Sequence, residues 1–247
     1  MCKTEFKKAT EIFSLIFFIF CIVLFSSCGM QVHFSLDPPV SYHKPDYSTS
    51  DYAQKYFEFR TASNSDAGEF TVLGTAVYYK IYGSSSALVT DVNSVEALNT
   101  YSNGSAAARK VIETLGYKQL GTSAGSVTPF ISGRNSKRVS VRLMTYGTDS
   151  DYSAKVEIGG VKQAWKPLRF DSRYTFEFGR NDSKYANYDN NKAPVQSDED
   201  VKGSASNGIW YVNMYAVSVG RDASYTPYYS LVCHLGSVAI DENSEDN

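Results

Sequence analysis

The sequence predicts a mainly β protein, and three observations lead to that fold class. The chain of 247 residues contains 19 tyrosines and 14 phenylalanines, and aromatic and β-branched side chains favour the pleated, half-buried surface of a sheet. Apolar and polar residues alternate through several segments, which is the period of a strand with one face in a core. Long helical periodicities are scarce, so we expect helix only at the start of the chain and in one inserted segment.

A basic segment followed by an apolar run predicts a signal-peptide helix over residues 1–27. Lys3, Lys7 and Lys8 precede the apolar run, which ends in two serines and Cys28. This order of basic, apolar and small residues is the mark of a secretory signal peptide. The run is about 14 residues long, whereas a helix needs about 20 to cross a hydrocarbon core, so a permanent membrane span is the weaker interpretation.

The end of this run, Leu24–Cys28, resembles the lipobox of bacterial lipoproteins in its looser, spirochaete-type form, because Phe25 stands where the family prefers leucine. The resemblance implies that a diacylglycerol is attached to the Cys28 thiol and that a peptidase cleaves just before it. The chain would then be anchored in the bacterial cell envelope, at the outer membrane or cell surface. Two or more acyl chains hold a protein firmly on a membrane, whereas one does not. Ordinary signal cleavage, with Cys28 left as a plain thiol, is the alternative.

Charge and cysteine content narrow the possible functions of the exported chain. Removing residues 1–27 takes away three lysines and two glutamates, which changes the formal net charge from −2 to −3. This mildly acidic balance gives no electrostatic reason to bind nucleic acid. Cys233 is the one cysteine left besides Cys28, so we expect neither a disulfide framework nor a cysteine-based metal site. We expect no cofactor.

The exported chain is predicted to consist of a tether, one folded domain and a short tail. Residues 28–55 carry Pro38, Pro39 and Pro45, and proline stiffens a chain and removes a donor from a strand ladder. We expect this segment to be a tether that ends in an edge strand. Residues 56–241 are predicted to form the domain, and residues 242–247 an acidic tail.

The domain is predicted to begin with two strands. Residues 56–60 alternate apolar with polar side chains, and the turn formers of residues 64–68 follow. Residues 70–82 predict a long strand with two distinct faces, Val77, Tyr79 and Ile81 on one and Tyr78, Lys80 and Tyr82 on the other.

An inserted segment, about residues 83–165, is expected to carry the helix. We expect one or two helical turns over Val95–Tyr101 and a helix over residues 106–115, with Ser105 as its N-cap and Gly116 ending it in the left-handed conformation. Two glycines between alternating runs signal a tight hairpin. Strands are predicted in four ranges of this segment, 127–131, 139–146, 154–158 and 161–165.

The last third of the chain is predicted to hold three strands and a long loop. Pro167 is expected to end the strand before it, and residues 174–178 to form the next strand. Residues 180–208 have too little apolar content to order themselves and are expected to be a polar loop. Residues 209–220 and 228–240 are predicted to be the closing strands.

Two segments resemble strands of fibronectin type III domains. Thr75–Lys80 resembles the third strand of that family, and Tyr211–Gly220 resembles its sixth. Phe59 stands roughly where the family places a core tryptophan. The resemblance implies an immunoglobulin-like β-sandwich with an inserted helical segment. It also implies a role in spacing or binding, which is what most domains of this family serve.

One serine stands in a motif that nucleophiles use. Residues 121–125 match G-x-S-x-G around Ser123, but that motif needs a helix after it, and Pro129 follows closely. A serine hydrolase using Ser123 is therefore the weakest interpretation. Cys233 and His234 are neighbours in a predicted strand, so their side chains should point to opposite faces. We expect Cys233 to be a buried, inert thiol, and we expect no catalytic residues.

No metal site is predicted. His33, His43 and His234 lack the spacing of zinc ligands. The acidic triplets at residues 149–151 and 198–200 do not continue into the loop pattern of an EF-hand, so they are interpreted as solvated loop charge.

Tyrosines supply the remaining candidate binding residues, because tyrosine is large, rigid and amphipathic and is enriched at contact surfaces. Tyr78 and Tyr82 flank Lys80 in a predicted strand, and Tyr225 and Tyr228 lie near a predicted loop. Pairing of these rings across strands on a half-covered sheet is the alternative.

The sequence therefore favours a lipid-anchored envelope protein that binds a partner or fills a structural role without catalysis. A carrier of a small ligand in an aromatic cleft is the second interpretation. A pocket with Ser123 near His234 and an aspartate would favour the hydrolase, and an enclosed aromatic cavity would favour the carrier. The partner expected from these features is the membrane, through the lipid on Cys28, with an unidentified protein as a further possibility.

Overall fold

The structure is a computed structural model that describes residues 35–122, 129–147, 150–169, 173–179 and 191–243. The compact unit begins at Ser35. The signal peptide, Cys28, His33 and Ser123 lie outside the described residues. Within those residues, no helix has the length and apolar character needed to cross a membrane.

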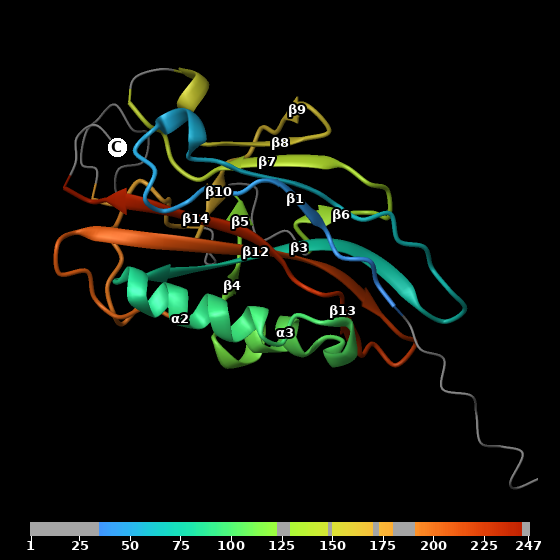
Figure 1. Cartoon of the computed structure of the whole chain (residues 1–247). Helices are drawn as coiled ribbons and strands as arrows, with labels where there is room; N and C mark the ends of the chain where they lie inside the picture. Colours follow the sequence, from blue (N-terminus) through green and yellow to red (C-terminus); the bar gives the residue numbers. More distant parts are fainter. Residues whose placement is uncertain (1–34, 123–128, 148–149, 170–172, 180–190, 244–247) are drawn as a thin grey trace, which may run out of the picture. The chain divides into compact units, whose positions relative to one another are not determined.

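The first sheet is antiparallel and five-stranded (Figure 1). Its order is β1-β2-β7-β8-β9. The strands are β1 (Val40–His43), β2 (Phe57–Arg60), β7 (Arg138–Arg142), β8 (Lys155–Ile158) and β9 (Val161–Lys162). The strands β8 and β9 form the predicted tight hairpin, in which Gly159 and Gly160 both have positive φ, 61° and 81°, as a two-residue turn of this kind requires.

The second sheet is built on two long strands, β3 (Thr71–Tyr82) and β12 (Ile209–Arg221), which pair antiparallel along their whole length. The outer edge of β12 pairs with two further strands, β13 (Pro227–Tyr229) and β14 (Cys233–Asp241). The outer edge of β3 pairs with three short strands, β4 (Lys118–Gln119), β6 (Ile131–Ser132) and β11 (Val201–Lys202), the last one parallel.

A separate two-stranded pair joins β5 (Gly121–Thr122) to β10 (Pro167–Leu168). Of the described helical elements, the 3-10 turn η1 precedes β3 and the others follow it. The helices are α2 (Ser85–Glu96) and α3 (Ala106–Arg109), which continues into the π-helical turn η3 (Lys110–Thr114). The 3-10 turns are η1 (Tyr52–Gln54), η2 (Tyr101–Asn103) and η4 (Ser150–Tyr152).

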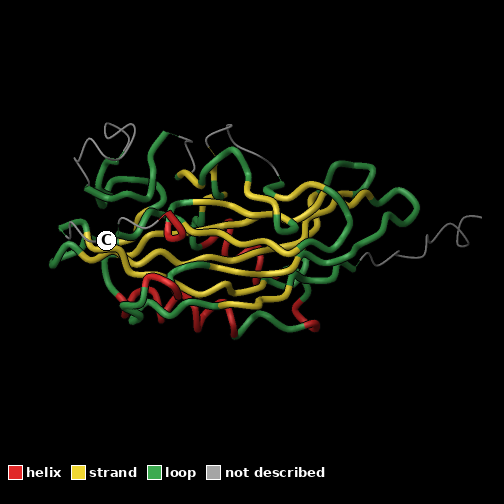
Figure 2. Tube along the Cα trace, turned by 90° about the horizontal axis from the view of Figure 1, so that it is seen from above, coloured by secondary structure: helices red, strands yellow, loops and turns green. Residues whose placement is uncertain are grey.

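The two sheets enclose the main core, and the helices cover the far side of the second sheet. Phe57 and Val141 from the first sheet share one buried cluster with Tyr79 and Val212 from the second. A second cluster joins the opposite face of the second sheet to α2 and η3. Figure 1 shows the resulting order of layers, with the helices beyond the second sheet, and Figure 2 shows from above how the strands run side by side. Among the described elements, the outer face of the first sheet has no α-helix over it, and only the 3-10 turns η1 and η4 contact it, at its Arg142 end.

The alternation of side chains in β3 confirms the predicted assignment of its faces. Val77, Tyr79 and Ile81 lie in the core between the sheets. Tyr78 and Tyr82 lie in the cluster beneath the helices. Because β3 is covered on both sides, all but two of its residues are buried. A strand buried on both faces carries apolar and aromatic residues on both, instead of alternating them with exposed polar residues.

The domain begins earlier than the predicted boundary at residue 56. The predicted edge strand is present as β1, and the backbone of Ser237 in β14 donates to the Pro45 carbonyl at 3.0 Å. Asp37 is also tied down, because its carbonyl accepts a hydrogen bond from the Ser218 hydroxyl at 2.7 Å. Residues 35–55 are thus part of the folded unit, and the tether prediction is wrong for them.

The longest helix among the described residues is one that the sequence pattern did not predict. Helix α2 begins after Ser84, whose hydroxyl accepts from the Ala87 backbone, and it ends at Glu96. The predicted turns over Val95–Tyr101 are therefore mostly the end of α2 and the loop after it. Gly116 ends the next helix with φ 66°, as predicted, but Ser105 makes no side-chain cap.

Three predictions for the last third of the chain are wrong in the described residues. Pro167 begins the short strand β10 rather than ending one. Residues 174–178 form no strand, although Phe176 and Phe178 are fully buried in the core between the sheets. Residues 191–208, the described part of the expected loop, include the strand β11 and the completely buried Asp200.

Candidate binding site

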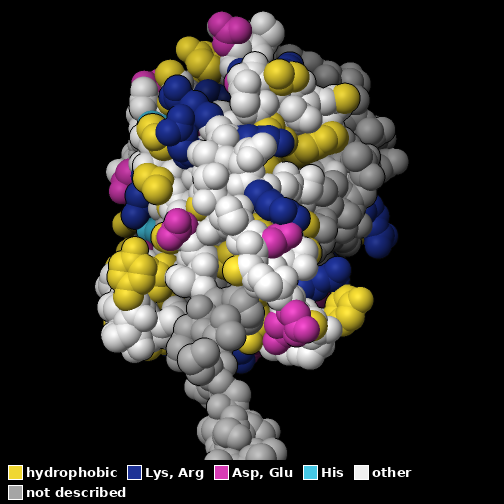
Figure 3. Space-filling model, turned by 90° about the vertical axis from the view of Figure 1, so that its right-hand side faces the viewer, with side chains coloured by type: hydrophobic (Ala, Val, Ile, Leu, Met, Phe, Trp, Pro, Cys, Tyr) yellow, Lys and Arg dark blue, Asp and Glu magenta, His cyan; other side chains and the backbone are white. Residues whose placement is uncertain are grey.

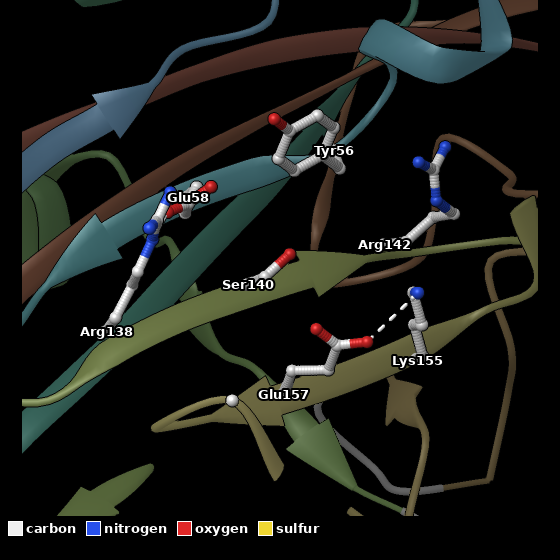
Figure 4. Close-up of a pocket in the computed structure, with 8 residues that line it drawn as sticks. Tyr56, Glu58, Arg138, Ser140, Arg142, Lys155 and Glu157 are labelled. Carbon is white, nitrogen blue, oxygen red and sulfur yellow. Dashed lines mark hydrogen bonds and ion pairs between the residues drawn. The ribbon is translucent and has the colours of Figure 1, made fainter. Parts of the chain in front are cut away.

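A hollow of about 390 Å³ lies on the outer face of the first sheet (Figure 4). Strands β2, β7 and β8 supply most of its lining, and the residue before β2 and the turn between β8 and β9 supply the remainder. The lining residues are Tyr56, Glu58, Arg138, Ser140, Arg142, Lys155, Glu157 and Gly160. One of the eight is aromatic and five carry charge, so the hollow is a polar site.

The alternation of strand side chains places this set on one face. In β7, Val139 and Val141 are buried in the core, so Arg138, Ser140 and Arg142 must point outward. Antiparallel register aligns them with their neighbours, as Figure 4 shows. Ser140 lies opposite Glu58 on one side and Glu157 on the other, and Arg142 lies opposite Lys155.

Two ion pairs occupy opposite ends of the hollow. The Arg138 guanidinium bonds the Glu58 carboxylate, and this hydrogen bond raises the pKa of Arg138. The Lys155 ammonium lies 3.0 Å from the Glu157 carboxylate. Arg138 is mostly exposed, whereas the Lys155 side chain is 25% exposed. The floor between the two pairs is the Ser140 side chain.

Arg142 is held between backbone carbonyls and aromatic rings. Its Nη1 donates to the carbonyls of Tyr52 and Lys55, at 2.5 and 3.3 Å. The guanidinium carbon lies 5.3 Å from the centroid of the Tyr152 ring and 5.5 Å from that of Tyr56. Arg142 is 6% exposed, and its burial lowers its pKa. These contacts fix the guanidinium at one end of the hollow.

The face around the hollow carries more cations than carboxylates. Besides Arg138, Arg142 and Lys155, it includes Arg60, which lies opposite Arg138, and Lys162, which lies opposite Glu157. Figure 3, a view from one end of the molecule, shows Lys and Arg side chains gathered in its upper part, on the side of this sheet. The face is therefore basic although the whole chain has a net charge of −2.

Two of the four tyrosines proposed from the sequence do not lie on the surface. Tyr78 and Tyr82 are buried beneath the helices, and burial raises the pKa of both. The Tyr82 hydroxyl donates to Asp91 of α2 at 3.0 Å and lies 2.9 Å from the Tyr117 hydroxyl. The prediction of an exposed patch at these positions is wrong because α2 and η3 cover this face of the sheet.

The other two tyrosines lie at the turn between β12 and β13. Tyr225 is 71% exposed and has φ 65°, and its ring lies 4.5 Å from the Arg221 guanidinium. Tyr228 is half-buried and packs edge-on against Phe70, with 5.5 Å between ring centroids. The structure does not bring these residues to the hollow or to the buried pair, so the four tyrosines do not form one site.

Cys233 and His234 point to opposite faces of β14, as predicted. Cys233 is half-buried and packs against the core between the sheets, whereas His234 contacts the Tyr215 ring on the helix side. Burial raises the pKa of Cys233 to about 11 and lowers the pKa of His234 to about 3. The ring of His234 is therefore neutral at pH 7 and hydrogen-bonds the Asn213 side-chain oxygen at 2.7 Å.

Cys233 should be unreactive in the folded protein. With a pKa of about 11, the thiolate that attacks an alkylating reagent is a small fraction of the thiol at pH 7.5. We expect labelling of the native chain to be at least about tenfold slower than labelling of the chain unfolded in urea. Rapid native labelling at Cys233, measured by mass spectrometry, would contradict this expectation.

The acidic triplet at residues 198–200 is an ion-pair site rather than solvated charge. Asp200 is completely buried and accepts from Arg169 Nε at 2.8 Å and from the Tyr79 hydroxyl at 2.6 Å. Asp198 accepts from Arg169 Nη2, also at 2.8 Å.

The other triplet, residues 149–151, is described only in part, because residue 149 lies outside the described residues. Across the described ranges, no cluster of His, Cys, Asp and Glu is arranged to hold a metal ion.

The fold and the hollow together define a mainly β protein, built chiefly of antiparallel sheets, with one charged sheet face that no α-helix in the described ranges covers. No family model, curated protein or solved structure matches the chain. The residues of the hollow were not predicted as a site from the sequence. The alternation Arg138–Arg142 was visible, but nothing in the sequence shows which strands lie beside it.

Proposed function

We propose that this chain is a lipid-anchored protein of the bacterial cell envelope that binds a partner without catalysis, through the outer face of its first sheet. The anchor is Cys28, on the strength of its lipobox-like context Leu24–Cys28. The folded unit begins at Ser35, a few residues after that cysteine. Anchoring at Cys28 therefore keeps the domain next to the membrane.

The observation that carries the binding role is the uncovered, hollowed face of the first sheet. The corresponding face of the second sheet is sealed by α2 and η3. The first sheet instead presents strands on which most outward residues are charged or aromatic, among them Tyr42, which is 56% exposed, with Ser140 and Val40 as exceptions. Arginine and tyrosine are enriched in binding interfaces, and side chains already held by ion pairs lose less conformational entropy on binding.

A fibronectin type III-like sandwich is the finer fold proposal. It is supported by the pairing of β3 with β12, because these two strands contain the segments that resemble the third and sixth strands of that family. The complete burial of Phe59 also fits, since it occupies the position of a core aromatic residue.

The alternative functions receive less support from the described residues. The hollow is polar and lies on an outer face, whereas the small-ligand carrier expected as the second interpretation needs an enclosed aromatic cavity. His234, the one histidine after Ser123 in the chain, is neutral, nearly buried and bonded to Asn213. That arrangement gives no reason to assign it as the base of a hydrolase.

Lysine footprinting on intact envelopes tests the proposed contact surface. Lys155 and Lys162 flank the hollow, so a bound partner should slow their acylation relative to the detergent-purified protein. We expect at least about a threefold decrease at both lysines, because an occupied face excludes the reagent.

Lys118 is the matched control for this measurement. It is also a strand lysine in an ion pair, at 2.7 Å from Glu199, and its side chain is 30% exposed against 25% for Lys155. Its acylation should be the same in both preparations. Equal rates at all three lysines, or equal protection of all three, would show that this face is not the contact surface.

A further inference from the structure

Two buried cations stand behind the hollow without a carboxylate in direct contact, although Asp51 acts on Arg142 and Asp241 on Lys55 from a longer distance, each raising the pKa of its cation. Arg142 and Lys55 are 6% and 7% exposed, and both lie over the Tyr146 ring, at 5.9 and 5.0 Å from its centroid. In the described part of the chain, no carboxylate lies within ion-pair distance of either one. Desolvation lowers the pKa of both groups.

This arrangement differs from that of Arg169, whereas Lys80, which is 8% exposed, likewise bonds a backbone carbonyl, that of Leu115, instead of a carboxylate. Arg169, which is 2% exposed, is paired with both Asp198 and Asp200. Buried charges are ordinarily paired in this way, because an unpaired charge loses its hydration without compensation. Ring faces and carbonyls offset part of that loss for Arg142, but they carry no formal negative charge.

The Arg142 guanidinium also has unused donors on its other side. Of its five N–H groups, the two on Nη1 go to the carbonyls of Tyr52 and Lys55. Nε is buried and has no partner in the described part of the chain. Nε and Nη2 together form the edge of a guanidinium that binds an oxyanion through two parallel hydrogen bonds.

We propose that the hollow binds an oxyanion, namely a carboxylate, sulfate or phosphate group of a small anionic ligand, between Arg142 and Lys155. This inference rests on the proposed function and specifies its ligand. Arg142 of β7 and Lys155 of β8 lie opposite each other, and the Ser140 hydroxyl is a further donor on the same face. The volume of about 390 Å³ suits a ligand of small-molecule size.

Glu157 has a definite role in this site. Its carboxylate lies 3.0 Å from the Lys155 ammonium and therefore forms an ion pair with it when no ligand is bound. A bound oxyanion competes with Glu157 for the same donor and is repelled by its charge. Removing the charge of Glu157 should therefore strengthen anion binding, whereas removing the charge of Lys155 should weaken it.

Calorimetric titration of the detergent-solubilised full chain tests the proposal. The probes are inorganic phosphate, sulfate and citrate, each compared with sodium chloride at matched ionic strength. We expect at least one probe to bind the wild type. We expect Lys155→Gln to weaken its affinity about tenfold or more, as loss of one charge-assisted hydrogen bond does. Ser140→Ala should weaken it less, and Glu157→Gln should strengthen it.

Lys118→Gln is the control, because it removes a lysine from an equivalent surface ion pair elsewhere, and it should leave the affinity unchanged. Thermal unfolding with and without the probe provides a second measurement, since a ligand of the folded state raises Tm.

The inference is overturned if no probe binds the wild type, or if Lys155→Gln and Glu157→Gln bind as the wild type does. Protection in the footprint without anion binding would refute this inference alone, whereas anion binding without protection would refute the proposed contact surface.

Discussion

Replacement of Asp200 by alanine is expected to destabilise the folded domain by about 3–5 kcal/mol, because it leaves the buried Arg169 without its main counter-charge. Asp200 is completely buried and accepts two hydrogen bonds from Arg169, at 2.5 and 2.8 Å, and one from Tyr79. Burial by itself lowers the pKa of Arg169. The hydrogen bonds to Asp200 and its charge have the larger effect in the opposite direction, so the pKa of Arg169 is raised. The free energy of unfolding, measured in urea at neutral pH, checks this expectation.

The neighbouring residue provides the control. Glu199 pairs with Lys118, and its side chain is 70% exposed, so Glu199→Ala should cost no more than about 1 kcal/mol. The same segment is changed in both variants, and burial of the carboxylate is the main difference between them. A loss for Asp200→Ala as small as the loss for Glu199→Ala would show that Arg169 finds other compensation.

Cys28→Ala is expected to abolish incorporation of a fatty-acid analogue into the chain. The analogue should enter the wild type, because the thiol of Cys28 is the proposed site of the diacylglycerol. Without that thiol no thioether forms, and the lipoprotein peptidase does not cleave the precursor, so the mass of the precursor should persist. Metabolic labelling followed by mass spectrometry reports both results.

Fractionation alone would be ambiguous here, because an uncleaved apolar run can hold the variant at the membrane. Cys233→Ala is the matched control, since it removes the other cysteine of the exported chain and should keep the label. The anchor proposal would be wrong if the wild type took up no label and its amino terminus lay elsewhere than Cys28. The folded unit begins at Ser35, so Cys28→Ala should leave the unfolding transition unchanged.

The strands with strong local signals were the ones that the sequence predicted correctly. The strands predicted over residues 70–82 and 209–220 have the same ends as β3 and β12 to within one residue, because long β-rich runs bounded by turn formers leave little ambiguity.

Helix α2 was missed, since its valines, threonine, asparagine and serines are weak helix formers. Its stability comes from packing Leu88 and Val95 on the second sheet, which is a tertiary effect.

The candidate site could not be predicted for a different reason. The hollow depends on the strand order β2-β7-β8, which brings together residues from distant parts of the sequence. Each strand shows its own alternation, but no local pattern tells which strand becomes its neighbour. The same limit applies to the tyrosines of β3. Their alternation predicted a shared face, but it did not show that a helix covers that face.

The pairing of β3 with β12 also limits how early the centre of the second sheet can form. Tyr82 lies opposite Tyr211 and Thr71 opposite Arg221, so the centre of the second sheet joins segments from the two halves of the chain. Closing so large a loop costs entropy before any contact compensates for it, and topologies of this kind fold slowly. A chain emerging amino terminus first therefore exposes the apolar residues of β3 until β12 has followed. During that interval the exposed apolar surface and the unpaired edges of β3 favour aggregation over folding at high concentration.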